Sequence, residues 1–572
     1  MSAAQQLSLV GGPIGVTQLE PDPGADYGEV FTRRWVVDFI LDLVGYTPDR
    51  DLGSLTIVEP SCGTAAFLGP IVDRLIKSAR DHGRPLASLT QAVRAYDLLD
   101  ANASLARKVI SLKLQDAGLD QEPADGLAIA WVATGDFLLH PHQPQSADFV
   151  VGNPPYIRLE SVTDRRMHAY RVLCPTMRGR ADIYIGFYEM GLSLLRANGV
   201  LGFICADRWM RNQYGADLRE LVSSRYAVDT VISMHDVDAF EDDVAAYPAV
   251  IVLRNQAQAS ASVVDASSSF GERDARRLAS WVRGGRGGTV VHDSYQASRV
   301  DRWFKGRDLW PTGSPSELAL IADLEARFPA LQDKATGTRV GIGVATGCDE
   351  VYITSDPTVV EEDRLLPLLH ASDIASGAVE WSGRFLVNPW DRHGLVDLVR
   401  FPRLAGYMEA HGDRLRARHI AKKRPATWFR TIDRVDHGLI DRPKLVLPDM
   451  KAASHPVLDD GRYYPHHNLY FIVSDAWDPE VLGGLLLSDV ANLFVGAYCV
   501  RMRGGTYRFQ AQYLRRIRVP EPERLSLTER RGLAQAFDDR DVDRATGIAA
   551  KVYGLSDAAC ATLQGCAARN RR

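Results

Sequence analysis

Short apolar runs alternate with amphipathic stretches through the first half of the chain. Apolar runs of this length, bounded by polar or turn-forming residues, predict buried strands. The predicted strands are residues 55–60, 92–98, 128–134, 147–152, 199–206, 228–234 and 248–254. Stretches with helical periodicity lie between most of them, at residues 33–44, 66–80, 183–197 and 215–224. This alternation predicts an α/β fold in which helices cover both faces of a mainly parallel sheet.

The last two predicted strands have only a short connection, which predicts that they pair antiparallel. The expected fold is therefore a Rossmann-like mixed sheet of seven strands, and we assign residues 1–270 to this domain. The Ala/Ser-rich residues 256–269 and the Arg/Gly-rich residues 283–288 are typical of surface loops or linkers.

The second half has weaker periodicity, with scattered short apolar runs, many prolines and many aromatic residues. It predicts a second, α+β domain with long loops over residues 300–525. Residues 526–572 form a polar tail whose pattern is helical, most clearly up to residue 553. The length of 572 residues agrees with two to four domains.

Composition excludes several classes of protein. The net charge of −5 argues against a globally basic nucleic-acid binder, so any attraction to phosphate must come from local patches. The seven cysteines form no Cys-x-x-Cys pair and no His cluster has metal-ligand spacing, so we expect neither a disulfide framework nor a metal site. No signal pattern and no membrane-spanning apolar run is present. We expect a cytoplasmic protein with no membrane partner.

Candidate ligand-binding residues follow the first strand. It ends in Glu59-Pro60-Ser61-Cys62-Gly63, directly before a predicted helix. Gly63 gives the backbone the freedom for a tight turn close to a ligand. The Gly-rich spacing and the lysine of a phosphate-binding loop are absent, and an acidic residue here suits a cationic amino group better than a phosphate.

The next two strands end in residues that suit a nucleoside. Asp97 can accept hydrogen bonds from both hydroxyls of a ribose, and Asp136 can accept from an adenine amine while Phe137 stacks on its ring. Each residue alone has an ordinary interpretation as a cap, a turn or a core residue. Open α/β sheets bind ligands beyond the carboxyl ends of their strands, and these residues follow consecutive strands. Ribose, adenine and a cationic amino acid together describe S-adenosylmethionine.

The fourth strand ends in Asn153-Pro154-Pro155-Tyr156. The side-chain oxygen of Asn153 and the backbone carbonyl of Pro154 can accept the two N–H groups of a planar amine. The consecutive prolines stiffen this loop, so both acceptors are oriented before a substrate binds. Tyr156 offers a flat surface on which a base can stack. The tetrapeptide therefore indicates methylation of an NH2 group.

These motifs resemble the γ-class methyltransferases that act on adenine in DNA, the TaqI-like group. Thr32 in GEVFTRRWVVDFIL matches the family's contact to the cofactor carboxylate, although Arg33 replaces the usual proline. VEPSCGTAAFL resembles the cofactor loop with Ala65 in place of its second glycine. Phe187 lies at a motif position, and Phe240 matches a second aromatic residue that contacts the flipped base.

The resemblance implies a particular reaction and site. The implied cofactor is S-adenosylmethionine, and the implied reaction is methylation of a flipped-out adenine in double-stranded DNA, in a restriction–modification system. Tyr156 and Phe240 are expected to sandwich the base. The implied cofactor residues are Thr32, Glu59, Pro60, Cys62, Gly63, Asp97, Asp136, Phe137, Asn153 and Phe187. The implied catalytic residues are Asn153, Pro154, Tyr156 and Phe240.

Two alternatives stay open. Methyltransferases of RNA or of protein glutamine share Asn-Pro-Pro-Tyr, but they are generally shorter than this chain and lack its second domain. The third interpretation is a DNA-binding module with a degenerate cofactor fold. The intact Asn-Pro-Pro-Tyr and the acidic residues at the strand ends argue against it. Residues 341–354, 365–374 and 504–520 resemble the target-recognition region of the DNA enzymes. We expect any cognate restriction endonuclease to be a separate chain, and a monomer suffices for the reaction.

Basic segments in the second half agree with a DNA partner. Residues 400–434 contain ten Lys or Arg and three acids, and residues 501–518 contain six arginines and no acid. Aromatic residues are interleaved with them, at Trp428, Phe429, Tyr507 and Phe509. Solvated helix faces are the ordinary explanation of charged runs. The aromatic residues favour a surface that contacts DNA.

Overall fold

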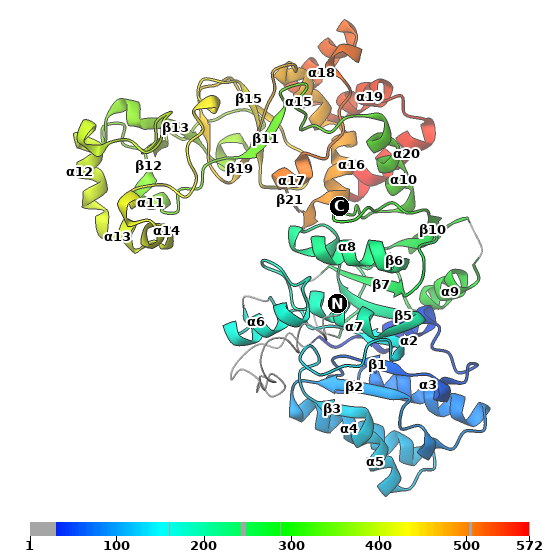
Figure 1. The fold of residues 1–572 in the computed structure, drawn as a ribbon. Helices are drawn as coiled ribbons and strands as arrows, with labels where there is room; N and C mark the ends of the chain where they lie inside the picture. Colours follow the sequence, from blue (N-terminus) through cyan, green and yellow to red (C-terminus); the bar gives the residue numbers. More distant parts are fainter. Residues whose placement is uncertain (1–29, 159–160, 242–246, 286–287, 503–505, 571–572) are drawn as a thin grey trace. The chain divides into compact units, whose positions relative to one another are not determined.

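The structure is a computed structural model that describes residues 30–158, 161–241, 247–285, 288–502 and 506–570. The chain divides into two compact units, Met1–Pro315 and Ser316–Arg572, which we call unit 1 and unit 2 and describe separately (Figure 1). The proposed functional boundaries at residues 270, 300 and 525 stay predictions.

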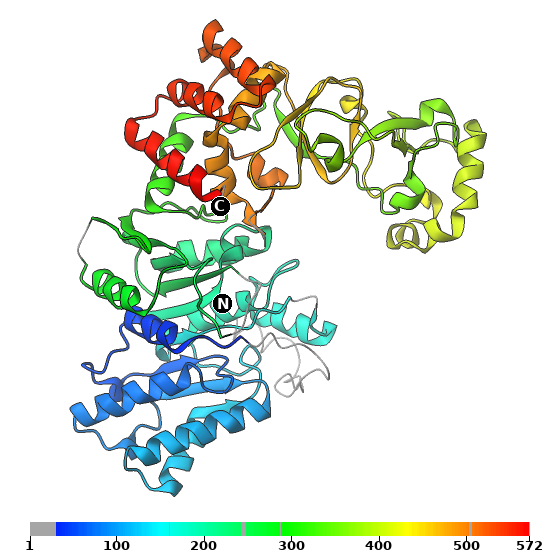
Figure 2. The same ribbon diagram turned by 180° about the vertical axis from the view of Figure 1, so that it is seen from behind.

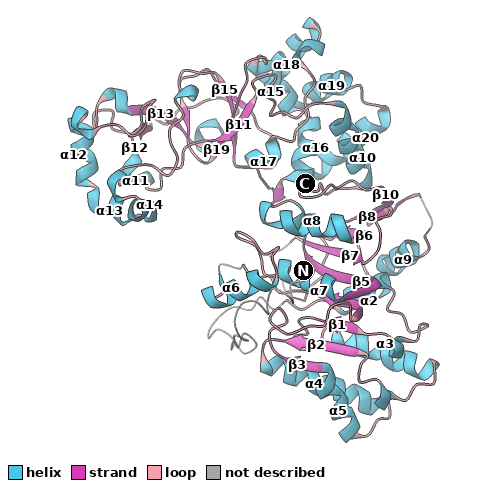
Figure 3. Ribbon diagram, in the orientation of Figure 1, coloured by secondary structure: helices cyan, strands magenta, loops and turns pink. Residues whose placement is uncertain are grey.

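Unit 1 is built on a ten-stranded mixed sheet with the order β3-β2-β1-β4-β5-β7-β6-β8-β10-β9 (Figure 3). All seven predicted strands form, as β1 (Ile57–Glu59), β2 (Val93–Asp97), β3 (Val132–Thr134), β4 (Ala147–Gly152), β5 (Leu195–Ala206), β6 (Ala227–Ser233) and β7 (Pro248–Arg254). Strands β3, β2, β1, β4 and β5 are parallel. Strand β7 pairs antiparallel with both β5 and β6. The predicted Rossmann-like mixed sheet and its antiparallel last pair are confirmed.

Both faces of the sheet are buried, which explains why its strands are almost continuously apolar. In β4, Phe149 and Val151 belong to one hydrophobic cluster and Val150 belongs to another. The first cluster includes helices α2 (Arg34–Val44), α3 (Leu68–Asp81), α4 (Asp100–Asp116) and α5 (Gln121–Trp131). The second includes α6 (Asp164–Leu173), α7 (Tyr184–Leu194) and α8 (Ala216–Arg225).

Two boundaries were predicted wrongly. Residues 128–131 belong to α5 and not to the third strand. This apolar segment buries Ala124, Leu127, Ala128 and Trp131, a helical spacing that a short apolar run does not distinguish from a strand. Similarly, residues 195–197, predicted as helix, begin β5.

The prediction of a loop over residues 256–269 was also wrong. Ala261–Ala266 form β8, which pairs parallel with β6 and is almost entirely buried. Two further strands, β10 (Tyr295–Val300) and β9 (Thr289–Val291), extend the sheet beyond it. Helix α9 (Glu272–Arg283) lies between β8 and β9 in the chain. The many Ala and Ser residues obscured the β-branched pair Val263-Val264 that packs inside the sheet.

Unit 2 has short strands in three small sheets, in agreement with the predicted α+β domain. The first sheet has the order β11 (Arg339–Ile342), β19 (Leu469–Val473), β15 (Lys444–Pro448) and β17 (Val457–Asp459). The second has the order β12 (Ile353–Thr354), β14 (Phe385–Val387), β13 (Leu365–Leu369) and β18 (Tyr464–Pro465). The third contains β16 (Met450–Lys451), β21 (Tyr507–Arg508) and β20 (Val500–Arg501).

The polar C-terminal segment is helical, as predicted, and forms α18 (Leu527–Asp538), α19 (Val542–Val552) and α20 (Asp557–Asn570). These helices pack beside α15 (Pro479–Leu487) and α16 (Asp489–Tyr498), and Figure 2 shows the red C-terminal helices next to the orange ones. They are therefore part of the fold of unit 2. Among the described residues, no single helix is long and apolar enough to cross a membrane, and only α15 with α16, bent by 63°, pass that test together.

Candidate cofactor and substrate site

The carboxyl ends of β1, β2, β3 and β4 surround one cavity in unit 1, with about 1130 Å³ of empty space including its open mouth. All ten predicted cofactor residues line it: Thr32, Glu59, Pro60, Cys62, Gly63, Asp97, Asp136, Phe137, Asn153 and Phe187. The parallel arrangement explains this convergence, because it brings the ends of these strands to one edge of the sheet.

Glu59, the last residue of β1, is a buried carboxyl group at the base of the cavity. It is 2% exposed, and among the described residues its Oε2 atom has no hydrogen-bond partner. Burial, followed by the charge of Asp97, raises the pKa of Glu59 well above its usual range. A buried polar atom without a partner is costly, so this carboxyl group suits a ligand that brings a positive charge or a donor.

The turn after β1 is held by the end of β2. The backbone N–H of Gly63, at φ +50°, donates to Oδ2 of Asp97 over 2.8 Å. Ala65, which replaces the second glycine of the γ-class cofactor loop, has φ +80°. The turn therefore keeps the left-handed backbone that glycine adopts readily, at a cost of about 1–2 kcal/mol for a residue with a Cβ.

Ala65→Gly should therefore stabilise the cofactor-free protein. The relieved backbone strain is partly offset by the greater entropy of glycine in the unfolded chain, which leaves a gain of up to about 1 kcal/mol. Chemical denaturation of the two proteins measures the difference. Ala130→Gly, at an exposed position of α5, is the control and should destabilise by about 0.5–1 kcal/mol. Equal losses in both variants would show that Ala65 is unstrained.

Asp97 is oriented by main-chain donors. Besides the bond from Gly63, its Oδ1 accepts from the N–H of Leu99 over 2.9 Å and from Nδ2 of Asn102 over 3.3 Å. Each carboxylate oxygen can accept more than one hydrogen bond, so the group keeps capacity for hydroxyl donors from the cavity. Asn102 also lines the cavity and was not predicted.

Asp136 and Phe137, after β3, are held by helices on the other side of the cavity. The hydroxyl of Tyr170 donates to Oδ2 of Asp136 over 2.6 Å, and burial raises the pKa of this carboxyl group. The ring of Phe137 stacks on Phe187 of α7, with centroids 5.4 Å apart and planes 24° from parallel. An adenine ring in this cavity would therefore meet an aromatic pair.

Arg166 and Tyr170 of α6 also line the cavity and were not predicted. They are the two buried residues of this helix and lie four residues apart, on one face. That spacing was a usable signal, but nothing in the sequence indicated which strand end this face would meet.

Asn153 has an amide group whose two ends differ in their partners. Nδ2 donates to the carbonyl of Val30 over 3.0 Å and to Oγ1 of Thr32 over 3.3 Å. Oδ1 is buried and has no partner in the part of the chain that the structure describes. The amide is thus fixed by its nitrogen and leaves its oxygen as an acceptor.

Phe240 is brought to this site by a short backbone pairing. Thr32 and Phe240 form an isolated antiparallel bridge, in which the N–H of Arg33 donates to Ala239 and the N–H of Glu241 donates to Phe31. The N-terminal segment thus contacts both Asn153, through Thr32, and the loop after β6. This connection joins residues that are far apart in the sequence.

The other predicted catalytic residues lie beside the cavity. Pro154, Tyr156 and Phe240 are not among its lining residues, whereas Pro155 is. The rings of Tyr156 and Phe240 are neighbours, with centroids 6.5 Å apart, but they meet edge to face at 83°. A base held between them in a sandwich would require one ring to turn. Burial raises the pKa of Tyr156 well above its usual range, so its hydroxyl stays protonated.

The first basic segment, residues 400–434, forms a mainly exposed part of unit 2. Lys422, Lys423 and Arg424, in and after α14 (His419–Lys423), are exposed. The guanidinium of Arg416 lies 3.9 Å from the ring centre of Trp428. Arg418, in contrast, donates to the carbonyls of Trp428 and Arg430 over 2.8 Å each and supports the fold.

In the second basic segment, residues 501–518, fewer arginines are available to contact DNA than the composition indicated. Arg515 donates to the carbonyl of Val340 over 2.9 Å, and Arg516 and Arg518 lie within 4.0 Å of Glu325. Tyr507 and Phe509 are buried core residues. Arg503 lies outside the described residues. Glu325, which is distant in the sequence, thus faces two of the six arginines, and contact of this segment with DNA stays a prediction.

The strand order and the cavity across the ends of its parallel strands define a Rossmann-like methyltransferase fold. Comparisons with known proteins agree. Residues 107–240 match the family model described as Eco57I restriction-modification methylase. The chain is 44% identical over 535 residues to the type II methyltransferase M.PaeR7I of Pseudomonas aeruginosa, covering 92% of each protein. It is 41% identical over 540 residues to M.XhoI of Xanthomonas vasicola, covering 93% of this chain and 98% of that protein.

The chain therefore belongs to the family of type II restriction–modification methyltransferases, and the predicted family is confirmed. Among solved structures, the type IIL restriction-modification enzyme MmeI, determined in complex with DNA, shares the fold with a TM-score of 0.55 at 12% identity. That match covers 94% of this chain and 76% of MmeI.

Proposed function

We propose that this methyltransferase transfers a methyl group from S-adenosylmethionine to the exocyclic amine of adenine in double-stranded DNA, and so protects host DNA in a restriction–modification system. The single observation that carries the proposal is the buried Oδ1 of Asn153, which has no partner among the described residues. Asn153 lines the same cavity as Glu59, Asp97 and Asp136. Such an acceptor suits an N–H donor of a substrate.

The cavity residues fit the proposed cofactor. S-adenosylmethionine supplies an electrophilic methyl group when bound. Glu59 provides a buried carboxyl group for its cationic amino acid part, and Asp97 provides a main-chain-oriented carboxylate for the ribose hydroxyls. Asp136 and the stacked pair Phe137–Phe187 provide an acceptor and an aromatic surface for the adenine.

The substrate amine is expected at the mouth of this cavity. The amine of adenine is not reachable inside a duplex, so the base must leave the stack. Oδ1 of Asn153 and the carbonyl of Pro154 would accept its two N–H groups and stabilise the positive charge that develops on nitrogen. Tyr156 and Phe240 are the aromatic surfaces nearest to this position. Positioning supplies much of the remaining acceleration.

DNA as the substrate is supported by the family and by the surface of unit 2. The relatives are named as type II methyltransferases, and MmeI was solved in complex with DNA. In this chain, Lys422, Lys423 and Arg424 are exposed cations, and Trp428, a few residues later in the chain, is partly exposed. Neighbouring cations of this kind attract phosphates. We propose that this part of unit 2 contacts the DNA backbone.

The test is transfer of a labelled methyl group to unmethylated bacterial DNA, followed by digestion to nucleosides. We expect label in N6-methyladenine and nowhere else. Label in methylcytosine, or in RNA or protein offered in the same assay, would overturn the assignment of adenine in DNA. Measured binding of S-adenosylmethionine in the same preparation distinguishes a wrong acceptor from a wrong cofactor.

Glu59→Gln is expected to weaken binding of S-adenosylmethionine tenfold or more, because an amide has no negative charge to attract the cationic amino group. The same change should stabilise the cofactor-free protein by on the order of 1 kcal/mol, or about 2–4 °C. The pKa of Glu59 is higher in the folded than in the unfolded protein, so this carboxyl group lowers stability as pH rises above about 4. The stability gained by Glu59→Gln should therefore increase as pH rises.

Calorimetric titration with S-adenosylmethionine and thermal denaturation without it measure the two effects. Glu189→Gln is the control, because Glu189 is a carboxyl group whose pKa is also raised by burial but which does not line the cavity. It should leave cofactor binding unchanged. Wild-type affinity in Glu59→Gln would remove Glu59 from the cofactor site.

A further inference from the structure

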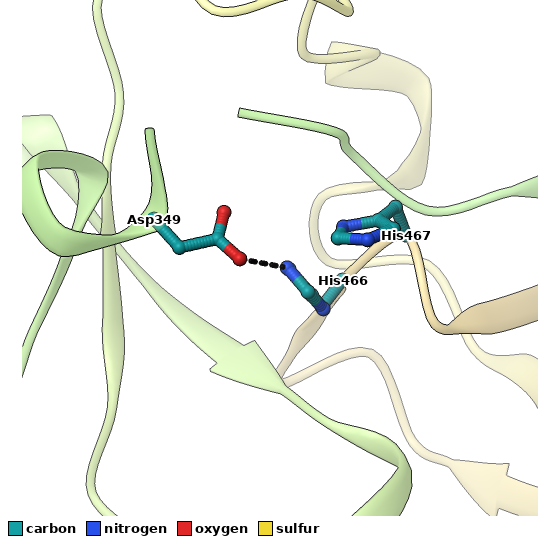
Figure 4. A group of neighbouring side chains, drawn as sticks. All are labelled: Asp349, His466 and His467. Atoms are coloured by element: carbon teal, nitrogen blue, oxygen red, sulfur yellow. Dashed lines mark ion pairs between the residues drawn. The ribbon is translucent and has the colours of Figure 1, made fainter. Parts of the chain in front are cut away.

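Three side chains of unit 2 that commonly bind metals lie together. They are Asp349, His466 and His467, and one ligand atom from each lies within 4.8 Å of the others (Figure 4). Asp349 begins the short helix α11 (Asp349–Tyr352), and the two histidines follow β18. The composition gave no hint of this group, because the pair of histidines has its third partner in a distant segment.

His466 is the central residue of this group and is 4% exposed. Neither of its ring nitrogens makes a hydrogen bond of normal geometry within the described ranges, and the polar side chains that face the ring are those of Asp349 and Asn468. Oδ2 of Asp349 lies 3.4 Å from Nε2, and a dashed line in Figure 4 marks this pair. A buried imidazole usually satisfies at least one nitrogen, so this ring has capacity for a ligand.

The surrounding backbone fixes the two segments against each other. Val344 and His466 form an isolated parallel bridge, and the N–H of His467 donates to the carbonyl of Val344 over 3.0 Å. The hydroxyl of the buried Thr346 donates to Oδ1 of Asp349 and orients its carboxylate. The ring of His370 stacks on that of His466, with centroids 4.3 Å apart. Such supporting contacts are typical around metal ligands.

We propose that Asp349, His466 and His467 bind one divalent transition-metal ion such as Zn²⁺. Two imidazoles and a carboxylate suit Zn²⁺, Ni²⁺ or Co²⁺, whereas Mg²⁺ and Ca²⁺ prefer oxygen ligands. Ligands of Zn²⁺ lie about 2.0–2.2 Å from the ion, so the three atoms must draw closer than the observed 4.8 Å. His467 is exposed, so its ring can rotate toward the buried His466 and the oriented carboxylate of Asp349, whose side chain is 48% exposed. The ion would then link the segment after β11 to the turn before β19.

The test is titration of the metal-free full-length protein, without a histidine tag, with Co²⁺ and then Zn²⁺. We expect one Co²⁺ per chain, visible absorption from its d–d transitions, and loss of that absorption when one equivalent of Zn²⁺ is added. Zn²⁺ should also raise the thermal denaturation temperature of the wild-type protein. None of these readouts depends on methyl transfer.

The variants Asp349→Asn and His467→Gln replace exposed ligands and leave the buried His466 in place. Each should weaken Co²⁺ binding at least tenfold while the metal-free variants denature like the wild type. His419→Gln, at an exposed histidine of the same unit, is the control and should bind like the wild type. Binding that is unsaturable, that exceeds one ion per chain, or that survives in both ligand variants would overturn the proposal.

Discussion

Asn153→Ala is expected to lower the rate of methyl transfer by about 10³-fold, the upper range for removal of one preorganised polar group at a reacting centre. Oδ1 of Asn153 is the buried acceptor that the proposed substrate amine would use, and alanine offers nothing in its place. The measurement is single-turnover methylation of a DNA substrate at saturating cofactor and DNA. This isolates the chemical step from binding.

The loss should be confined to catalysis. Glu59, Asp97 and Asp136 remain in the Asn153→Ala protein, so binding of S-adenosylmethionine should change by less than about tenfold. Tyr156→Phe is the matched control in the same loop. The hydroxyl of Tyr156 is buried without a hydrogen-bond partner in the described chain, and its removal leaves the stacking surface intact. Tyr156→Phe should keep near wild-type activity. An active Asn153→Ala protein would refute the proposed role of the amide.

The meeting of the candidate cofactor residues in one cavity was predictable because it depends on local chemistry and on one topological rule. Each of four strands ends in a distinct polar residue, and parallel pairing brings those ends together. That Glu59, Asp97, Asp136 and Asn153 would lie around one cavity could therefore be predicted from the order of the motifs, and their roles stay proposals. Even the replacement of glycine by Ala65 left the turn in its left-handed conformation.

Features that depend on distant partners were not predictable in this way. Arg166 and Tyr170 reach the cavity from a helix whose position no local pattern determines. Arg516 and Arg518 have no acidic residue in their own segment. Glu325, which lies far earlier in the chain, faces both of them in the folded protein. The group of Asp349, His466 and His467 has the same character. Whether a charge is paired, and whether candidate metal ligands meet, depends on tertiary contacts that a short segment of sequence does not reveal.

The loop that carries Phe240 depends on a second buried network. Asp207, directly after β5, is 1% exposed and accepts two hydrogen bonds from the buried Arg211, over 2.6 and 2.8 Å. It also pairs with Nε2 of His235 over 2.9 Å, and His235 follows β6. Asp207 therefore links the end of β5 to the loop that leads to Phe240. Burial opposes its ionisation, but Arg211 and His235 lower the pKa of Asp207 below its usual range.

Asp207→Asn is expected to destabilise the protein by about 3–5 kcal/mol, since Arg211 keeps its buried charge and loses its carboxylate. Asparagine has almost the same shape, so the loss reports charge and not packing. The free energy of unfolding can be followed by fluorescence, because Trp209 is fully buried two residues away. Glu272→Gln, which breaks the exposed pair of Glu272 with Arg276, is the control and should cost less than about 1 kcal/mol.

The pH dependence provides an independent check on the same network. The pKa of Asp207 is lower in the folded protein than in the unfolded one, so its stabilising effect is complete above the unfolded pKa, about 3.9, and declines as pH falls further. The difference between wild type and Asp207→Asn should therefore be constant near neutral pH and shrink in acid. Adding Arg211→Met to Asp207→Asn should recover stability, because the double variant no longer buries an uncompensated cation. If the double variant were less stable than Asp207→Asn, the contribution of Asp207 would lie in packing, and the electrostatic account of this loop would fail.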